Sequence, residues 1–427
     1  MKMKKIVSML MLISALLGLA ACGSQSDDSA NEGTITVMLD SEPGQDDPVV
    51  HTMEKWKQET GNDYEILVVG YDDQLTKFPI MIKNDDLPDL LITTRLHKEY
   101  PEDFVDLSQE VDMDYFDPDL LRVALGNYNE GIQILPTQIT VTNYFYNKEA
   151  FDEAGITPPT PDNLWTLEEL YENAEKLVES GAVNFGLAVD YSRARYDNLM
   201  YSNGGSITET IDGQPVVAVN SPENIATLQK FIEANEEGIA PKNIWAGGSP
   251  DNPMNYFENG DVGIYLSGSF NYANIARDAK IEFGVMPSPI GTKQQSALNG
   301  GRGWGVPKNS PNAALATEFV KWFYNSESTY QEFLDLDFGL PFMENYTYEP
   351  TSTFQVDDYQ LYVQELANIP EEFLVDEANQ WGLYLEDDYR QAMSQAVSGE
   401  LSAEEALNRV AERIAQNAGW AMKYQNE

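Results

Sequence analysis

A regular alternation of short apolar, β-branched runs with helical patterns limits this chain to few folds. We expect strands at 34–39, 65–69 and 88–92, with helices at 50–59 and 72–83 between them. A helix between two strands indicates a parallel pair, because the chain must cross back to the starting edge of the sheet before the second strand begins. Parallel sheets are covered by helices on both faces. The pattern therefore predicts an α/β fold with helix-flanked sheets.

Four later helices carry sequence signals for their first residues. Two begin with a Ser/Thr-x-x-Glu capping box, and two begin with a Ser-Pro pair. These start signals are at Thr166, Ser221, Ser310 and Ser402. Apolar residues follow each start at helical spacing, which is typical of helices packed on a core and not of cofactor motifs.

The N-terminus has the composition of a secretory signal peptide. Residues 1–21 begin with a basic stretch, continue with an apolar run shorter than the ~20 residues that span a bilayer, and end in small residues. The passage ending at Cys22 resembles the bacterial lipobox, in which the cysteine is acylated. Cys22 is the only cysteine of the chain, which argues against a disulfide framework. Residues 22–32 are small and polar, so we expect a lipidated Cys22 followed by a flexible tether.

The charge and the scarcity of metal-binding residues exclude several functions. The chain has 70 acidic and 26 basic residues, a formal net charge of −44. Charge of that sign opposes binding to nucleic acid and to anionic membranes. With two histidines and one cysteine, a zinc site of the usual Cys/His type is close to excluded. We expect no metal and no cofactor.

Recognisable catalytic motifs are missing from the sequence. The Gly-rich segment 300–305 does not match a dinucleotide or phosphate loop, and no G-x-S-x-G elbow occurs. Acidic residues are so abundant that no carboxylate pair can be assigned to glycoside hydrolysis. The 7 Trp, 23 Tyr and 17 Phe suit a site that stacks sugar rings on aromatic side chains, although most aromatic residues belong to cores. We therefore expect a binding protein and not an enzyme.

Six passages, in order along the chain, resemble the extracellular solute-binding lipoproteins of ABC importers, a family that includes maltose-binding protein and multi-sugar binders. The most specific is 135–165, which contains LPTQ, YFYNKE, AGI and PP before Trp165 and matches the family's LP…YYNK…AGL…PP…TW passage. The others are 77–91, 203–205, 256–270, 300–307 and 339–341. The resemblance covers essentially the whole chain after the tether.

The resemblance implies a two-lobed, periplasmic-binding-protein-like fold of type II, in which each lobe is a sheet flanked by helices. It puts an N-terminal lobe at 33–139 plus 298–338 and a C-terminal lobe at 140–297 plus 339–427. A hinge lets the lobes close over a ligand in the cleft between them. The closed form would dock on a membrane permease. We expect a monomer outside the cytoplasm, anchored to the cell membrane through Cys22, as on a Gram-positive surface.

The same resemblance supplies candidate ligand-binding residues. Glu42 follows the first strand, and Thr94 follows the third. Phe270 stands where many relatives carry a stacking Trp, so the aromatic platform there is smaller. The full candidate set is Glu42, Thr94, Arg95, Gln138, Thr140, Tyr191, Arg193, Tyr196, Phe270, Tyr272, Arg302, Trp304 and Trp381.

The function that the resemblance implies is the capture of a sugar or short oligosaccharide and its delivery to an ABC transporter permease. One alternative keeps the fold and changes the ligand to a polyamine, a metal chelate, a phosphorylated polyol or a peptide. A lipoprotein glycosidase and an adhesin or sensor subunit are further alternatives. The sequence leaves the identity of the sugar open.

Overall fold

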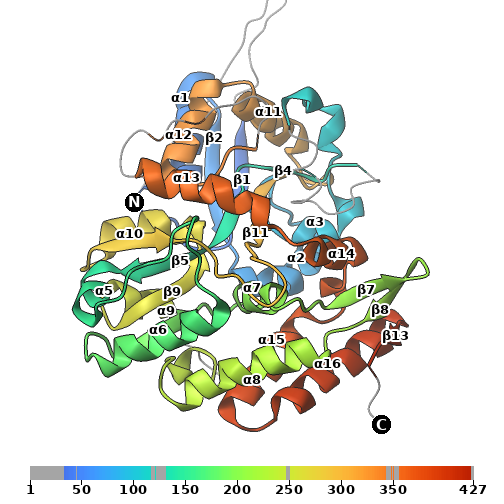
Figure 1. The fold of residues 1–427 in the computed structure, drawn as a ribbon. Coiled ribbons are helices and arrows are strands. Elements are labelled where there is room, and N and C mark those ends of the chain that lie inside the picture. The colour runs from blue at the N-terminus through green and yellow to red at the C-terminus, as the bar shows by residue number, and fades with distance from the viewer. Residues whose placement is uncertain are drawn as a thin grey trace, which may run out of the picture.

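The computed structural model describes residues 33–44, 46–116, 121, 131–246, 251–342, 348, 350 and 355–424. The signal peptide, Cys22 and the tether predicted for residues 1–32 lie outside the described residues. Figure 1 shows two β-sheets, one in the upper and one in the lower part of the view, each accompanied by helices.

The first sheet has the strand order β2-β1-β3-β12-β4. Its strands are β1 (Thr34–Leu39), β2 (Asp63–Val68), β3 (Leu90–Thr93), β4 (Ile134–Pro136) and β12 (Gly303–Gly305). β1 runs parallel to β2 and β3, whereas β12 is antiparallel to β3 and β4. Helices α1 (Pro48–Thr60) and α2 (Gln74–Asn84) follow β1 and β2. The parallel strand–helix–strand order predicted for residues 34–92 is confirmed.

The second sheet has the order β10-β5-β9-β6. Its strands are β5 (Thr140–Asn147), β6 (Phe185–Val189), β9 (Val262–Gly268) and β10 (Phe283–Met286), and the short β11 (Asn299–Gly300) also pairs with β5. β6 and β9 are parallel, and β5 is antiparallel to β9 and β10. Every residue of β9 is buried, as expected for a strand covered on both faces.

The remaining helices pack on these sheets, on a small third sheet or on one another. They are α3 (Leu96–Glu99), α5 (Lys148–Ala154), α6 (Leu167–Glu179), α7 (Arg193–Ser202), α8 (Pro222–Glu236), α9 (Pro253–Glu258), α10 (Tyr272–Asp278), α11 (Ala313–Tyr324), α12 (Glu327–Asp337), α13 (Val356–Glu365), α14 (Glu371–Asn379), α15 (Gly382–Ser398) and α16 (Ala403–Ala418). A small third sheet contains β7 (Thr208–Ile211), β8 (Gln214–Val217) and β13 (Ala421–Met422). In the described part of the chain, no helix combines the length and the apolar character needed to span a bilayer.

The chain passes repeatedly between the two large sheets. Strand β4 of the first sheet ends at Pro136, and strand β5 of the second sheet begins at Thr140. On the return, β11 pairs with the second sheet and β12, a few residues later, pairs with the first. Helix α12 then packs on α1, where Lys55 and Glu332 form an ion pair of 2.8 Å. The exact lobe boundaries given above remain a prediction.

Three of the four predicted helix starts are confirmed. Thr166 and Ser402 form complete capping boxes, and Ser221 caps α8 ahead of a proline. The start predicted at Ser310 is wrong, because α11 begins at Ala313 after Asn312. The cause is a tertiary contact: the backbone N–H of Asn312 donates to Asp89 Oδ1 at 3.0 Å and fixes the start of the helix there.

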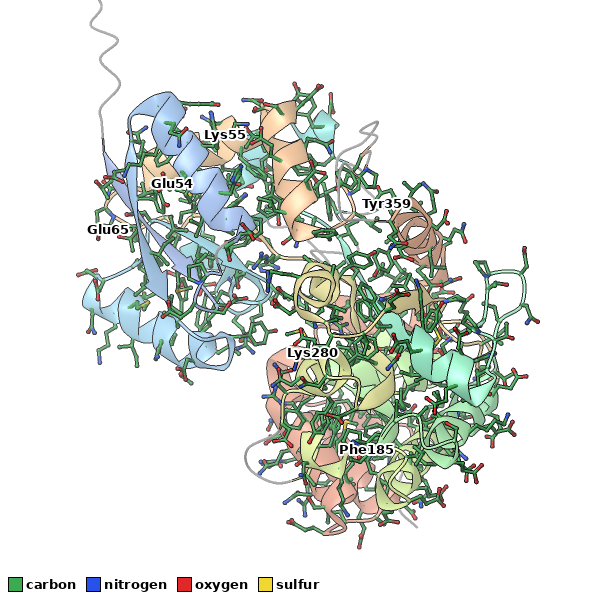
Figure 2. The ribbon with its side chains drawn as sticks, turned by 90° about the vertical axis from the view of Figure 1, so that its left-hand side faces the viewer. Glu54, Lys55, Glu65, Phe185, Lys280 and Tyr359 are labelled. Atoms are coloured by element: carbon green, nitrogen blue, oxygen red, sulfur yellow. The ribbon has the colours of Figure 1, made fainter. Side chains whose placement is uncertain are left out.

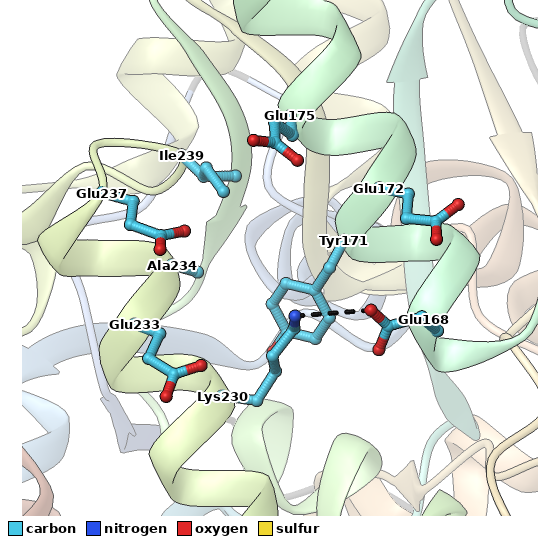
Figure 3. Close-up of a pocket in the computed structure, with 9 residues that line it drawn as sticks. All are labelled: Glu168, Tyr171, Glu172, Glu175, Lys230, Glu233, Ala234, Glu237 and Ile239. Atoms are coloured by element: carbon cyan, nitrogen blue, oxygen red, sulfur yellow. Dashed lines mark ion pairs between the residues drawn. The ribbon is translucent and has the colours of Figure 1, made fainter.

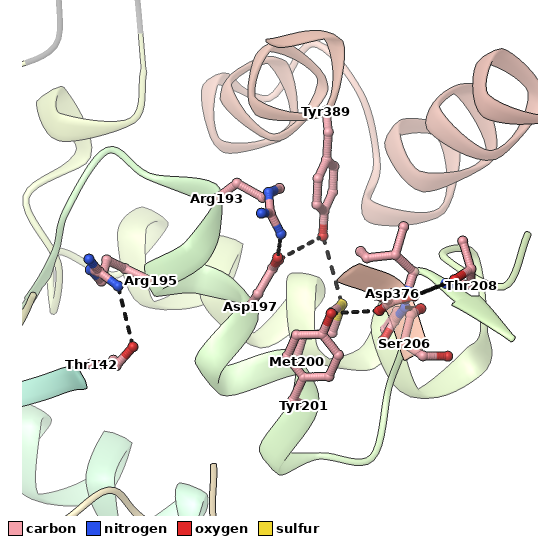
Figure 4. Close-up of polar contacts among 12 residues, drawn as sticks. Thr142, Arg193, Arg195, Asp197, Met200, Tyr201, Ser206, Thr208, Asp376 and Tyr389 are labelled. Carbon is pink, nitrogen blue, oxygen red and sulfur yellow. Dashed lines mark hydrogen bonds and ion pairs between the residues drawn. The ribbon is translucent and has the colours of Figure 1, made fainter. Parts of the chain in front are cut away.

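A buried carboxylate ties α14 to the second-sheet side of the molecule (Figure 4). Asp376 accepts hydrogen bonds from the Tyr201 hydroxyl at 2.5 Å, from the Ile207 backbone at 2.9 Å, and from the backbone and hydroxyl of Thr208 at 2.6 and 2.5 Å. Burial raises the pKa of Asp376 to about 7, against the effect of these donors. Because every donor is itself buried, the carboxylate fixes the position of α14 on β7.

We expect Asp376→Ala to lower the free energy of unfolding by about 3 kcal/mol or more, because it leaves several buried donors without an acceptor. Urea unfolding at neutral pH measures this difference. Asp388→Ala is the matched control, since the Asp388 side chain is 41% exposed and pairs with Arg413 at 3.5 Å. Its effect should stay within about 0.5 kcal/mol. Equal losses in the two variants would contradict the structural role of Asp376.

Candidate ligand-binding site

A cavity of about 640 Å³ lies between the two large sheets. Residues that follow β1, β3, β6 and β9 line it, so it faces the carboxyl ends of parallel strands in both sheets. Ligands of open α/β sheets bind at such ends. Its volume is in the range of small-molecule sites. Figure 2 shows the two parts of the molecule from the side, with Glu54 and Glu65 in one part and Phe185 and Lys280 in the other.

The first-sheet side of the cavity is acidic. The loop between β1 and α1 contributes most of it, and Tyr71 and Thr94 complete it. The lining residues of the loop are Asp40, Ser41, Glu42, Gly44, Asp46, Asp47 and Pro48. Asp47 also caps α1, since its Oδ1 accepts from the backbone of Val49 at 2.8 Å.

The second-sheet side carries the cations Arg195 and Arg277 beside Phe270. Arg195 is largely buried, and its Nη1 donates to Thr142 Oγ1 at 3.3 Å (Figure 4). Its Nε lies 3.9 Å from Asp190 Oδ2. Burial lowers the pKa of Arg195, against the attraction of Asp190. That carboxylate already accepts from two hydroxyls of β9, and Arg195 Nε has no hydrogen-bond partner among the described residues. Arg195 therefore keeps donor capacity beside the cavity.

The floor of the cavity is made where the chain crosses between the sheets. Gln138, Thr140, Gly301, Arg302 and Asp337 line it. Arg302 Nη2 and Asp337 Oδ1 form an ion pair of 3.1 Å, in which the Asp337 side chain is 7% exposed. Burial alone would lower the pKa of Arg302, but the carboxylates of Asp337, Asp40 and Asp47 together outweigh it and raise that pKa. Burial also raises the pKa of Asp337, although Arg302 acts in the opposite direction.

Two half-exposed aromatic rings face the cavity from opposite sides. Tyr71 is 40% exposed on the first-sheet side, and Phe270 is 40% exposed on the second-sheet side. Each ring is covered on one face by a guanidinium: Arg95 lies 3.9 Å from the Tyr71 centroid and Arg195 lies 5.3 Å from the Phe270 centroid. The remaining ring surface is apolar area that a ligand in the cavity can cover.

The structure brings part of the predicted residue set to this cavity. The predicted residues that line it are Glu42, Thr94, Gln138, Thr140, Phe270 and Arg302. Arg95 lies just outside, where it stacks on Tyr71 and donates to the Tyr71 backbone oxygen. Whether these residues bind ligand remains a prediction.

The other predicted residues do not line the cavity. Trp304 is 0% exposed and packs against Phe319 at 5.0 Å between ring centroids. Tyr272 is buried and donates to Asp358 at 2.6 Å. Four further predicted residues contact side chains that do not line the cavity: Tyr191, Arg193, Tyr196 and Trp381.

Helix phase explains why Arg195, and not the predicted Arg193, reaches the cavity. Ser192 and Arg195, three positions apart, share the face of α7 that meets the cavity. Arg193 and Asp197, four apart, share another face and pair with each other. Tyr71 was also missed. Its only signal in the sequence was an aromatic residue shortly after a predicted strand.

A second, much smaller cavity of about 60 Å³ lies between α6 and α8 (Figure 3). Five glutamates surround it together with Lys230, which pairs with Glu168 at 3.5 Å and lies 5.5 Å from the ring centroid of Tyr171. Within the described ranges, no group of three or more His, Cys, Asp or Glu side chains is arranged to hold a metal ion. The larger cavity is therefore the candidate ligand site.

The chain belongs to the bacterial extracellular solute-binding protein family, whose model matches residues 48–330. It is thus a solute-binding protein. This agrees with the family resemblance noted in the sequence and with a cavity at the carboxyl ends of strands from two sheets.

Individual relatives add detail. The sn-glycerol-3-phosphate-binding periplasmic protein UgpB of Shigella dysenteriae is 28% identical over 209 residues, 46% of this chain and 46% of that protein. The matched region thus spans about half the length of the curated relatives.

Solved structures match most of the chain. The ABC substrate-binding protein Lmo0181 of Listeria monocytogenes, in complex with cycloalternan, has a TM-score of 0.77 and 20% identity over 91% of this chain and 100% of that one. The GacH receptor of Streptomyces glaucescens, solved unliganded and with acarbose, has a TM-score of 0.77 and 19% identity over 91% and 99%. At such identity the likeness shows the fold alone, and the predicted two-lobed α/β fold class is confirmed.

We expect Arg302→Met to destabilise the protein by about 3 kcal/mol, because it leaves Asp337 buried without its cation. The double variant Arg302→Met/Asp337→Leu should recover most of this loss, since it removes both charges. Urea unfolding of both variants measures the difference, with Lys77→Met in the exposed pair with Asp73 as a control of small effect. A double variant as unstable as the single one would show that the pair is not the cause.

Proposed function

We propose that this protein captures a carbohydrate outside the cell and delivers it to the membrane permease of an ABC importer. The observation that carries the proposal is the pair of half-exposed rings, Tyr71 and Phe270, on opposite sides of one cavity. Sugars present an apolar C–H face and a rim of hydroxyls, so they fit aromatic surfaces that are surrounded by planar polar groups. Here Glu42, Gln138 and Arg195 supply such groups.

The comparisons support a sugar as the solute. The similar structures carry cycloalternan and acarbose, both carbohydrate-type ligands, in folds that this chain shares over about nine-tenths of its length. Family membership supports a binder without catalysis and a transport role. Closure of lobes 33–139 plus 298–338 and 140–297 plus 339–427 over the sugar would form the face that the permease binds.

A phosphorylated polyol is the second candidate solute. The curated relatives bind sn-glycerol-3-phosphate, and the Nε donor of Arg195 has no hydrogen-bond partner among the described residues. An arginine with free donors suits a phosphate. Against this, four carboxylates on the first-sheet side, those of Asp40, Glu42, Asp46 and Asp47, would repel an anion. A neutral sugar avoids that repulsion.

A thermal-shift screen with neutral sugars and with glycerol-3-phosphate separates the two candidates. We expect a sugar at a hundred times its Kd to raise the Tm by a few degrees, because such occupancy adds about 2.7 kcal/mol to the stability. Tyr71→Ala should then weaken binding of that sugar by about 1 kcal/mol in calorimetry, through loss of a stacking surface.

Tyr115→Ala is the matched control for the aromatic variant, because Tyr115 is similarly exposed, at 44%, and does not line the cavity. A shift produced by glycerol-3-phosphate and by no sugar would replace the carbohydrate proposal with the phosphorylated polyol. Equal affinity in wild type and Tyr71→Ala would remove Tyr71 from the site.

We further propose that the protein is a monomeric lipoprotein of the cell membrane, facing the outside. Residues 1–21 would be the signal peptide, Cys22 the acylated residue, and 22–32 the tether. The support is the lipobox-like passage before the only cysteine of the chain. Acyl chains hold a protein at a bilayer with ~0.8 kcal/mol per buried methylene.

Expression of Cys22→Ser in a Gram-positive host tests the anchor. We expect the wild type to sediment with membranes and the variant to appear in the medium or to keep its signal peptide, because no thiol remains for acylation. Immunoblots of the fractions give the result. A wild-type protein found free in the medium would contradict the lipid anchor.

A further inference from the structure

One ion pair connects the two sides of the cleft directly. Lys98 Nζ on α3 and Glu377 Oε2 on α14 are 2.8 Å apart. α3 follows β3 of the first sheet, whereas α14 packs on β7 and is tied to α7 by Asp376. In Figure 1, α3 and α14 lie next to each other at the right of the molecule. The pair therefore joins a helix that follows a strand of the first sheet to a helix on the second-sheet side of the molecule.

Both partners of the pair are near segments that line the cavity, although neither of their side chains lines it. Thr94 lines the cavity, and Lys98 is one helical turn further along the same segment. On the other wall Ser192 and Arg195 line the cavity, and Arg193 between them turns away from it. The guanidinium of Arg193 lies 4.6 Å from the ring centroid of Trp381. Trp381 is four positions after Glu377 in the chain.

The surroundings hold this contact in place. The side chains of Lys98 and Glu377 are only 30% and 20% exposed. Burial would raise the pKa of Glu377, but the charges of Lys98 and Arg193 outweigh it and lower that pKa, so Glu377 is ionised at neutral pH. The neighbouring Asp376 anchors α14 through buried donors (Figure 4), so little freedom is lost when Glu377 meets Lys98.

We propose that the Lys98–Glu377 ion pair is the end wall of the binding cleft and limits the length of the saccharide that the protein accepts. The inference rests on the proposed function and adds a size limit to it. A longer saccharide that extends past Thr94 and Ser192 must separate the pair, which costs the attraction between two partly buried charges. Short saccharides that fit the 640 Å³ cavity leave the pair intact.

Charge reversal tests the length limit, with the mature chain carrying Cys22→Ser as the parent. The probes are glucose, maltose, maltotriose and maltotetraose, together with xylose and its oligomers up to xylotetraose, titrated by calorimetry. In the parent we expect affinity to fall at least tenfold between the shortest bound member and the tetrasaccharide. Lys98→Glu and Glu377→Lys should each abolish that fall, and the double reversal should restore it.

The control variant is Lys57→Glu, which breaks an exposed ion pair of 2.7 Å with Asp63 on the outside of the first-sheet part. It should leave the length profile unchanged. A second readout does not depend on sugar: spin labels at Glu65→Cys and Lys280→Cys, both exposed and on opposite parts in Figure 2, report the separation of the two sides. We expect a single narrow distance in the parent, a broader and longer one in each single reversal, and the narrow one again in the double reversal.

Each outcome bears on a different claim. Parent affinity that stays equal or rises with saccharide length overturns the end wall and leaves the carbohydrate function standing. The same length profile in the parent and in both single reversals also overturns it. If no saccharide of either series binds the parent while glycerol-3-phosphate does, the carbohydrate function fails and the length limit fails with it. In that case the spin-label distances still show whether the ion pair joins the two sides.

Discussion

The segments that cross between the sheets pack so closely that side chains do not fit between them. A Cβ on Gly301 would lie 2.5 Å from the backbone oxygen of Gln138, and a Cβ on Gly303 would lie 2.5 Å from that of Leu135. Backbone hydrogen bonds join the same segments: Thr137 donates to Arg302 at 2.9 Å, and Ile139 and Leu340 exchange a pair of bonds at 2.8 Å. These glycines therefore permit close approach, and the packing they allow holds the cavity floor in one position. The placement of every lining group on either side depends on this floor.

The charge distribution around the floor is unlike that of the chain as a whole. The protein carries a net charge of −44, yet Arg195, Arg277 and Arg302 all line one cavity. Carboxylates of the β1–α1 loop face them across the same space. A ligand between an acidic wall and a cationic wall can form hydrogen bonds with charged groups on both sides. Such hydrogen bonds are stronger than those between neutral groups. A polyhydroxylated molecule can donate to one wall and accept from the other, and this property favours a sugar over a solute with a single kind of charge.

Periodicity in the sequence predicted the strands and helices well, whereas the cavity residues were predicted from the family resemblance, and only in part. Glu42, Thr94 and Phe270 came from that resemblance, and they line the cavity because residues after the carboxyl ends of parallel strands converge on one edge of a sheet. Trp304 failed to reach the cavity because β12 is an inner strand of the first sheet, so its tryptophan packs against Phe319 of α11. β12 is only three residues long, so its sequence has too little alternation to show which face of the sheet the Trp304 side chain is on. The stacking of Arg95 on Tyr71 joins residues 24 positions apart and was equally invisible to local patterns.

That stacking has a mechanical consequence for the cleft. Arg95 precedes the four-residue helix α3, so its contact with Tyr71 ties the segment after β2 to the segment after β3, which carries Thr94 and Lys98. A ligand that covers the Tyr71 ring therefore contacts the residue on which Arg95 stacks, next to the helix that carries the ion pair to Glu377. On the opposite wall, Phe270 lies against Arg195, and Arg195 shares α7 with the Tyr201 that binds Asp376 beside Glu377. Both aromatic surfaces are thus linked through short, rigid elements to the two ends of one ion pair.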